Sequence, residues 1–401
     1  MLSWSGIVGQ GQSTHWGFEM DFNETDDQRA LRSAVRELID KEAPQERVKE
    51  WDERAHYPKE LYDLLASLGY YGLPLPEEYG GGDQGVTGMI IVAEELARRG
   101  LELAAGYGNT IFLAMNILRN GTQAQKRHHL PRAIRGEERY SICMTEPEAG
   151  SDAAAIRTSA REQDGGFVIN GQKLYTTGAG LPNSVLHVTA RTDPEAERHS
   201  GMTMFLVPAD SPGIEIRRLR TVGRHLLGTN EVFFDNVHVE RDQMLGPLNQ
   251  GWDVLHSNLE LERALTCAGF IGALSTVFEM TKAYVNGRKQ FNRPIGAFQA
   301  VAHPIADMYC DLESARLLTY KAASLLDAGS PAFTEVTAAK LFGSEALQRA
   351  TNTGMQLMGG AGFMMEYDMQ RYWREARVAT VTAGSSQIQR TVLARAIGIA
   401  K

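Results

Sequence analysis

Glu262 and Arg263 stand side by side in LHSNLELERALTCAG, a stretch whose apolar residues have the spacing of a helix. A carboxylate that is shielded from water can remove a proton from carbon, and a guanidinium beside it can bind an anionic group. The structural alternative is a solvated helix face, because Glu260 adds a further charge nearby. Taken alone, the pair is more simply explained as part of such a solvated face.

Hydroxyl and aromatic side chains gather in two stretches further upstream. CMTEPEAGSD contains Thr145 and Ser151, whose hydroxyls can donate hydrogen bonds, and Gly150, which lets the backbone approach a planar or phosphorylated ligand. GQKLYTTGAG contains Tyr175, which can stack on a ring, and Thr177, which can donate to a ring nitrogen. Taken alone, the first stretch is also an ordinary turn and the second an ordinary strand end.

Three later stretches offer groups for a nucleotide and its phosphates. GRKQFNRPIGAFQAV supplies a guanidinium for a pyrophosphate, and MQLMGGAGF supplies bare backbone for close packing. VTAGSSQIQR places small residues and hydroxyls before a short terminal helix, and its tip at Ala383 carries no ionisable group. The candidate residues in these stretches are Arg288, Phe291, Gln299, Gln356, Gly360, Gly384, Ser385 and Gln387. A helix break, a helix C-cap and a helix-to-helix turn are the structural alternatives.

Helices are expected to position the first part of the chain. We interpret residues 1–21 as a flexible tail, because they have neither a positive n-region nor an apolar run long enough for export. Residues 22–138 are mainly helical in pattern, and a capping box of Thr25 with Gln28 precedes a helix predicted over about 25–43. This part of the chain should therefore form an N-terminal helical domain.

The pattern then changes twice along the chain. Residues 139–245 alternate apolar and polar positions between Gly, Asn, Asp and Pro, which predicts an antiparallel β unit. Residues 246–401 return to long amphipathic helices, which predicts a bundle that buries part of its surface against another subunit.

Bulk composition argues against several classes of function. The chain has 401 residues, 43% hydrophobic and 22% charged, which is typical of a globular protein with two or three packed units. A formal net charge of -8 gives no basic field for nucleic acid, and no apolar run is long enough for a membrane span. Cys143, Cys267 and Cys310 have no disulfide or metal spacing, which predicts reduced thiols, no metal site and a cytoplasmic location.

Together, in this order, these motifs closely resemble the acyl-CoA dehydrogenase family of flavoproteins. The resemblance covers residues 22–400, and PEEYGGG at 76–82 adds another turn typical of the family. It implies an α+β fold that is mainly α, with an N-terminal helical domain, a middle β-barrel-like domain and a C-terminal four-helix bundle. It also implies FAD as the cofactor.

The resemblance assigns the candidate residues to parts of the cofactor. The counterparts of Thr145 and Thr177 hydrogen-bond the flavin ring, and that of Tyr175 flanks it. The segment after Arg374 and Glu375 reaches the FAD, with Ser385 and Gln387 on its adenosine side and Gly384 at a close backbone approach. A neighbouring subunit would hold the diphosphate and adenine through Arg288, Phe291, Gln299, Gln356 and Gly360. The site would thus require at least a dimer, and the family is usually tetrameric.

The base needs a separate argument. In the reaction of this family, a base removes a proton from the α-carbon of an acyl thioester while the β-hydrogen is transferred as hydride to the flavin. Many members carry the base at the position of Ala383, and alanine cannot accept a proton. Members of the isovaleryl and long-chain type place it just before an arginine, as Glu262 precedes Arg263. We expect Glu262 to be the base, Ala383 to leave space for substrate, Arg263 to anchor the CoA phosphate and Ser151 to contact cofactor and thioester.

The resemblance therefore implies FAD-dependent conversion of acyl-CoA to 2-enoyl-CoA by a homo-oligomer, with an electron-transferring flavoprotein as electron acceptor. The acyl carrier is either CoA or an acyl carrier protein. Two alternatives stay open. One is a base-deficient, FAD-binding partner subunit of a hetero-oligomer, which Ala383 supports and Glu262 opposes. The other is a flavin monooxygenase or oxidase on the same fold.

Overall fold

The computed structural model describes residues 23–399, so the tail expected at 1–21 lies outside the described residues. The N-terminal helices are α1 (Asp26–Glu42), α2 (Gln45–Arg54), α3 (Lys59–Ser67), α4 (Gly85–Ala97), α5 (Leu101–Asn120) and α6 (Gln123–Ile134). The predicted capping box is confirmed. The Thr25 hydroxyl accepts from the Gln28 backbone N–H at 3.2 Å, and the Gln28 side chain accepts from the Thr25 N–H at 3.0 Å.

The strands of the middle region form one eight-stranded sheet. They are β1 (Arg139–Cys143), β2 (Ser159–Gln163), β3 (Gly166–Thr177), β4 (Ser184–Arg191), β5 (Met202–Pro208), β6 (Ile214–Arg218), β7 (Thr229–Val239) and β8 (Met244–Leu245). Their order is β6-β7-β3-β2-β4-β5-β8, and β1 also pairs with β4. The ladders are antiparallel, except that β4 runs parallel to β1 and β2. Residues of β4 are buried almost throughout, including the polar Ser184, His187 and Thr189, and its apolar side chains join two different hydrophobic clusters.

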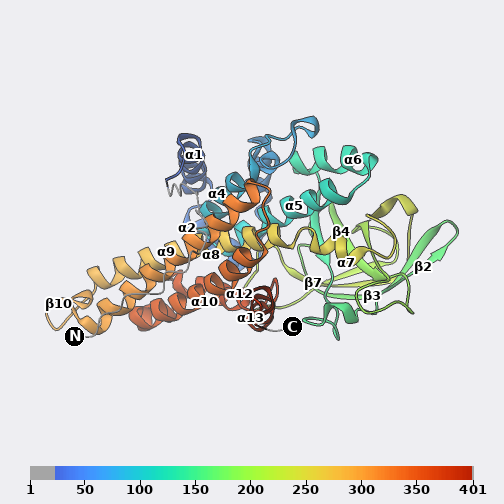
Figure 1. Ribbon diagram of the computed structural model, residues 1–401. Coiled ribbons are helices and arrows are strands. Elements are labelled where there is room, and N and C mark those ends of the chain that lie inside the picture. The colour runs from blue at the N-terminus through green and yellow to red at the C-terminus, as the bar shows by residue number, and fades with distance from the viewer. Residues whose placement is uncertain (1–22, 400–401) are drawn as a thin grey trace, which may run out of the picture.

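The C-terminal region is a set of long helices. They are α7 (Gly251–His256), α8 (Leu259–Gly287), α9 (Gln299–Asp327), α10 (Phe333–Met358), α11 (Gly360–Phe363), α12 (Met369–Ala379) and α13 (Ser386–Ala396), and a hairpin of β9 (Lys289–Gln290) and β10 (Arg293–Pro294) joins α8 to α9. Figure 1 shows α8, α9 and α10 packed lengthwise and extending away from the sheet, with β10 at their far end.

Helix α8 is the central helix of the protein. The stretch Gly251–Gly287 is long and apolar enough to cross a membrane by length and composition, but 78% of its most apolar window is buried inside the protein, as in the core helix of a globular domain. Gly272 of α8 lies against α4, where an added Cβ would sit 2.0 Å from the Glu94 carbonyl oxygen. Only glycine allows the two helices to approach this closely.

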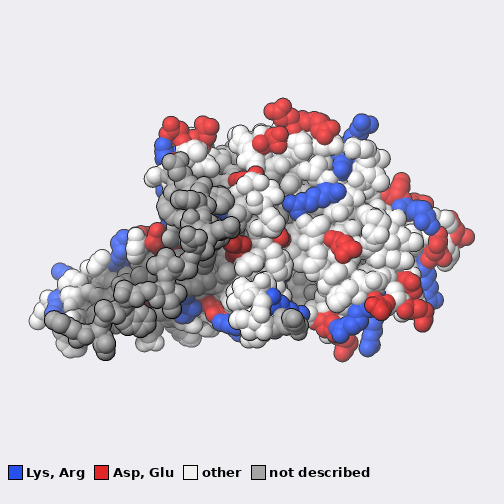
Figure 2. All heavy atoms as spheres, viewed as in Figure 1, with Lys and Arg blue, Asp and Glu red and all other residues white. Residues whose placement is uncertain are grey.

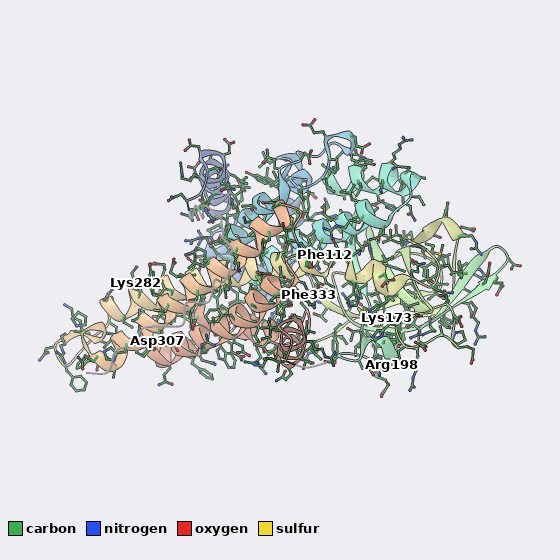
Figure 3. The ribbon with its side chains drawn as sticks, in the orientation of Figure 1. Phe112, Lys173, Arg198, Lys282, Asp307 and Phe333 are labelled. Carbon is green, nitrogen blue, oxygen red and sulfur yellow. The ribbon has the colours of Figure 1, made fainter. Side chains whose placement is uncertain are left out.

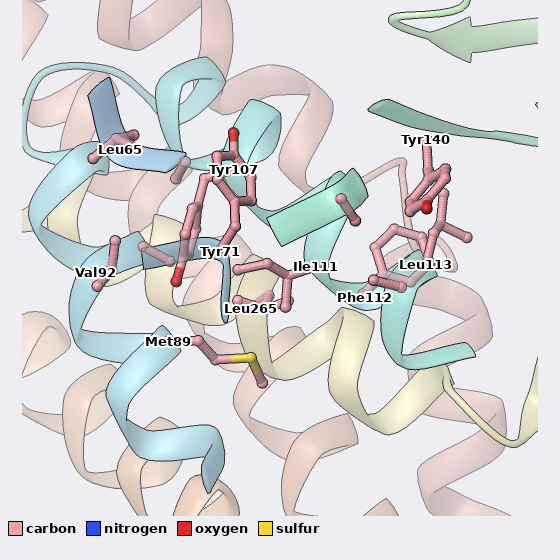
Figure 4. Close-up of a cluster of buried hydrophobic side chains, with 14 of the residues drawn as sticks. Leu65, Tyr71, Met89, Val92, Tyr107, Ile111, Phe112, Leu113, Tyr140 and Leu265 are labelled. Atoms are coloured by element: carbon pink, nitrogen blue, oxygen red, sulfur yellow. The ribbon is translucent and has the colours of Figure 1, made fainter. Parts of the chain in front are cut away.

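The main hydrophobic cluster joins the N-terminal helices to α8 and to the sheet. Met89 of α4, Tyr107 of α5 and Leu265 of α8 belong to it, together with Tyr140 of β1 (Figure 4). The rings of Tyr71 and Tyr107 pack with their centres 5.4 Å apart. The sheet is therefore held against the helices by a shared core, which fixes residues of β1 and β3 relative to α5 and α8.

Charged side chains of both signs are mixed over the described part of the face in Figure 2. Some form exposed ion pairs, such as Arg135 with Glu137 at 2.7 Å. Mixed signs create little long-range attraction for a polyanion.

Glu102, near the start of α5, joins three parts of the chain. Its carboxylate accepts from the backbone N–H groups of Leu226 at 2.8 Å and Leu227 at 2.7 Å, in the loop before β7. Glu375 of α12 accepts from the adjacent Leu101 N–H at 2.7 Å. Burial, and after it the charge of Glu375, raises the pKa of Glu102 to about 7.

This raised pKa predicts a pH-dependent stability. Folding favours the neutral form of Glu102. Its contribution to the free energy of unfolding is therefore fully present below the ordinary pKa of 4.5 and is lost as pH rises through about 7. In Glu102→Gln the thermal midpoint should fall less between about pH 5.5 and about pH 8 than in the wild type. Calorimetry at the two pH values checks this, and an equal fall in both proteins would show that Glu102 does not titrate in that range.

Candidate functional site

Glu262 lies in the first turn of α8. Its backbone N–H donates to the Asn258 carbonyl at 3.1 Å, and its carbonyl accepts from the Thr266 hydroxyl at 2.8 Å. The Asn258 side chain donates to the carbonyl of Phe112, which ties this turn to α5. Hydrogen bonds on both sides therefore fix the backbone that presents Glu262.

The Glu262 carboxylate is half-buried and has no hydrogen-bonded or ion-paired partner among residues 23–399. Burial raises its pKa above 4.5, against the charges of Arg263 and Lys340, which lower it. A carboxylate in this state has free lone pairs and a raised basicity, as a proton acceptor requires.

Arg263 is a buried cation with unused donors. It is 7% exposed, and its guanidinium carbon lies 5.5 Å from the ring centre of Phe333, which Figure 3 labels at the start of α10. Its Nε and Nη1 have no hydrogen-bond acceptor among the described residues. Buried N–H groups are nearly always paired in folded proteins, so these two atoms mark a place for an anionic or carbonyl oxygen.

The turn between α12 and α13 lies close to the same place. Ala383 and Gly384 are both left-handed, with φ of 52° and 82°. Gln389 Nε2 donates to the Ala383 carbonyl at 2.8 Å, and Lys340 Nζ donates to the Gly384 carbonyl at 2.6 Å. Lys340 also interacts electrostatically with Glu262. The structure thus brings Glu262 and the Ala383–Gly384 turn to one buried lysine.

Ser385 and Gln387 follow this turn. The Ser385 hydroxyl caps α13 by accepting from the Ile388 backbone N–H at 3.3 Å, and Gln387 is exposed. The Ser385 hydroxyl keeps its own proton available for a ligand while it acts as a cap. The sequence analysis did not predict this cap, because it considered only a helix-to-helix turn or a ligand contact for the stretch.

Thr145, Tyr175 and Thr177 come together at the ends of β1 and β3. The Leu174 N–H donates to the Thr145 carbonyl at 2.8 Å. Tyr175 has φ of 60° where β3 shifts register against β7, and its side chain is 63% exposed. Thr177 lines a small cavity between the sheet and the N-terminal helices, with other walls from Tyr57, Gly106, Tyr140 and Leu227.

A buried ion pair anchors the loop that carries Thr145. Lys173 of β3 is 0% exposed, and its Nζ donates to Glu146 at 2.8 Å and to the Met144 carbonyl at 3.1 Å. Burial lowers the pKa of Lys173, although Glu146 opposes this. The pair therefore holds the start of the loop against β3.

The same carboxylate holds the end of the loop. Glu146 accepts from the backbone N–H groups of Arg157 at 2.6 Å and Thr158 at 3.0 Å. Burial alone would raise the pKa of Glu146, but Lys173 and these N–H groups outweigh it and lower the pKa. Ser151 is exposed between the two anchored ends.

The remaining candidates lie at the opposite end of the molecule from the sheet (Figure 1). The hairpin β9–β10 is there, and α10 ends there. Phe291 is 86% exposed, and a Cβ added at Gly360 would meet nothing within 4 Å. The other exposed candidates at this end are Arg288, Gln299 and Gln356. One chain does not bring these residues to Thr145, Tyr175 and Thr177.

One cluster of side chains has the geometry of a metal site, but its carboxylate already has protein partners. His128, His129 and Glu138 offer ligand atoms within 4.8 Å of one another. Glu138 Oε1 already lies 2.7 Å from Arg132 Nε, and its other oxygen accepts from the Tyr140 hydroxyl at 3.1 Å. A cation is thus already present at this carboxylate, and we assign no metal to it.

The chemistry of these groups fits FAD as the resemblance implies it. Tyr175 and Phe291 present exposed aromatic rings, Gly360 presents open backbone, and Arg288 is exposed. Thr177 faces a cavity beside the sheet. Planar rings, phosphates and hydroxyls of a dinucleotide are recognised by such groups.

Comparison with known proteins identifies the family. Family models match the chain over residues 25–137 (acyl-CoA dehydrogenase, N-terminal domain), 141–237 (middle domain) and 249–398 (C-terminal domain). The isovaleryl-CoA dehydrogenase of Oryza sativa subsp. japonica is 35% identical over 86% of this chain and 85% of its own. The 3-(aryl)acrylate reductase of Clostridium sporogenes is 32% identical over 92% and 98%.

Solved structures agree. The butyryl-CoA dehydrogenase of Megasphaera elsdenii has a TM-score of 0.90 at 32% identity, covering 94% of this chain and 100% of its own. Similar solved structures include complexes with FAD, and the predicted fold class and cofactor are confirmed. The three cysteines are free, as their spacing predicts. The chain belongs to the acyl-CoA dehydrogenase family of FAD-dependent oxidoreductases.

Proposed function

We propose that this protein dehydrogenates the α,β bond of an acyl thioester, with Glu262 removing the α-proton. The observation that supports this most directly is a half-buried Glu262 carboxylate that has no partner within residues 23–399 and whose pKa is raised by burial. Ala383 supports it too, because a methyl group at the nearby turn adds no competing base.

The residues around Glu262 have complementary tasks in this proposal. The α-proton of a thioester is weakly acidic, so the base must face it with little water between them, and the half-buried position of Glu262 meets this need. The unpaired Nε and Nη1 of Arg263 bind the CoA phosphate side. Ser151, on the exposed part of its loop, contacts cofactor and thioester. Bound FAD supplies the acceptor for the β-hydrogen.

The cofactor site in this proposal spans two chains. Thr145 and Thr177 hold the flavin ring and Tyr175 flanks it. Ser385 and Gln387 bind the adenosine side, and Gly384 provides a close backbone approach. Another chain supplies Arg288, Phe291, Gln299, Gln356 and Gly360. The separation of these groups within one chain supports a homodimer or homotetramer (Figure 1). An electron-transferring flavoprotein then removes the electrons. A monomeric mass by light scattering, with FAD still bound, would contradict the shared site.

A second function is favoured by the match to the 3-(aryl)acrylate reductase. The same groups can work in the opposite direction, with protonated Glu262 returning a proton to the α-carbon of an unsaturated substrate. A raised pKa suits this role as well, since it increases the protonated fraction. Reoxidation of the reduced flavoprotein by arylacrylic substrates, faster than reduction by any saturated thioester, would select this direction.

Anaerobic titration of the purified flavoprotein tests the proposal. Short, branched, aromatic and long acyl-CoAs, and one acyl group on an acyl carrier protein, are added separately while the visible flavin band is recorded. Bleaching by one class is expected and would name the acyl group and its carrier together.

Other outcomes of this titration separate the alternatives. Bleaching that needs a second, different chain would indicate a partner subunit. A flavin that no thioester bleaches, but that turns over rapidly in air with another reductant, would indicate an oxidase or monooxygenase. Dithionite reduction is the control that the bound flavin is competent.

A further inference from the structure

Lys340 is a buried cation that the proposed reaction does not use. It lies within α10 and is 0% exposed, and its one hydrogen bond to the described part of the chain goes to the Gly384 carbonyl at 2.6 Å. Among residues 23–399, no carboxylate lies within ion-pair distance of it. Lysine is almost never fully buried without such a partner, because desolvation of an ammonium group is costly. Packing alone would be served better by an apolar side chain.

The charged and titratable groups that face Lys340 come from α8 and α10. They are Glu262, Arg263 and Cys267 of α8 and Glu345 of α10. Burial lowers the pKa of Lys340 to about 8 and raises that of the Cys267 thiol to about 12, so this thiol is neutral at ordinary pH. Glu345 is already paired with Arg390 at 2.6 Å. Glu262 is therefore the unpaired carboxylate that Lys340 faces.

Lys340 also faces the turn at Ala383 and Gly384. Ala383 has φ of 52°, a left-handed conformation that is unfavourable for a residue with a Cβ and must be held by its surroundings. Two buried side chains hold it: Gln389 through the Ala383 carbonyl and Lys340 through the Gly384 carbonyl. Gln389 Nε2 also lies 3.4 Å from the Gly384 carbonyl, so loss of Lys340 would leave that oxygen with only this longer hydrogen bond.

We propose that Lys340 is a positioning residue of this active site. It holds the Ala383–Gly384 turn beside the substrate, and its positive charge favours the ionised form of Glu262. The second part rests on the proposed function, because it takes Glu262 as the base. The first part rests only on the hydrogen bond and the burial of Lys340.

Three substitutions separate the two parts. Lys340→Met removes both the donor and the charge, whereas Lys340→Gln removes the charge and keeps a donor for the Gly384 carbonyl. Ser344→Ala is the matched control, because Ser344 is equally buried one turn later in α10. Its hydroxyl donates to the Leu341 carbonyl of its own helix and, within residues 23–399, to no other group. All are prepared as the FAD-replete full-length protein.

The first readout is the pH dependence of flavin reduction by the acyl thioester identified above. Loss of the positive charge raises the pKa of Glu262, so the rate should fall off at a pH roughly one unit higher in both Lys340 variants. Ser344→Ala should keep the wild-type profile. An unshifted profile in both Lys340 variants would overturn the electrostatic part.

The second readout needs no turnover. Hydrogen exchange of the peptide spanning 380–389, measured by mass spectrometry, should be faster in Lys340→Met and close to wild type in Lys340→Gln and Ser344→Ala. Unchanged exchange in Lys340→Met would overturn the positioning part. If Lys340→Met does not fold, Lys340→Arg is measured in its place. Lys340→Arg keeps the positive charge, so it should keep the wild-type pH profile. Glu262→Gln is assayed in parallel: full activity there would reject the base assignment, while the exchange result still decides the positioning part.

Discussion

Replacing Glu262 with glutamine should slow the reduction of FAD by an acyl thioester by about 10²- to 10⁴-fold, the usual contribution of a positioned proton acceptor. The amide keeps the shape of the side chain but cannot accept a proton. Glu262 has no hydrogen-bonded partner among the described residues, so Glu262→Gln should retain its FAD and its thermal midpoint. Anaerobic stopped-flow absorbance of the flavin band measures the rate.

Glu260→Gln is the control for this result. Glu260 lies two positions earlier in α8, is also half-buried and carries the same charge, so it should leave the rate close to wild type. If both variants lose the same amount of rate, the effect comes from the negative charge at the start of α8 and not from Glu262 as a base. A wild-type rate in Glu262→Gln would reject the base assignment while leaving the family membership intact.

The pH profile of the wild type gives a second check on Glu262. Burial raises its pKa above 4.5, and a base works only when it is ionised. The rate should therefore fall as pH drops through a value above 4.5. In Glu262→Gln, the residual rate should lose this dependence.

Replacing Lys173 with methionine should have the largest effect on stability. Lys173 is fully buried, and its removal leaves the Glu146 carboxylate buried without its cation. Breaking a buried pair from one side costs about 3–5 kcal/mol. The loop with Thr145 and Ser151 should loosen as well, so a lower thermal midpoint and a weaker hold on FAD are expected. Calorimetry and the ratio of flavin to protein absorbance after gel filtration measure the two effects.

Two comparisons make this result specific. The double variant Lys173→Met/Glu146→Gln removes the uncompensated charge and should recover much of the stability. Arg198 forms an exposed ion pair with Asp152, which lies in the loop that the Glu146–Lys173 pair anchors. Arg198→Met removes this exposed pair and should change the thermal midpoint little. Figure 3 shows both Lys173 and Arg198 in the sheet region. Equal effects of Lys173→Met and Arg198→Met would mean that burial of the pair does not matter.

Local signals in the sequence predict the fold best where they are self-contained. The capping box of Thr25 and Gln28 places the first helix over about 25–43, and α1 spans Asp26–Glu42. The alternating runs between 139 and 245 likewise become strands. The parallel pairing of β1 with β4 has no such signal. It depends on where β2 and β3 lead the chain, which is a property of the whole sheet.

The candidate site is harder to predict because its buried charges need partners far away in the chain. Lys173 shares the inward parity of Phe167 and Ile169 in β3, so its burial is visible in the pattern, but its partner Glu146 is 27 positions away. Lys340 interrupts the apolar face of VTAAKLFGSEAL, again a detectable signal. What it faces depends on how α8, α10 and the Ala383 turn pack together, and no periodicity describes that.

The Glu146–Lys173 pair also bears on how such an enzyme can diverge. It secures both ends of the loop, through Lys173 at the start and the Arg157 and Thr158 amides at the end, while the segment around Ser151 stays exposed. Mutations and short insertions in that segment should therefore cost little stability. Most changes in the core would instead bring the protein close to its stability limit. Related enzymes can therefore acquire new substrates through changes around Ser151, while the buried Glu146–Lys173 pair and the sheet stay the same.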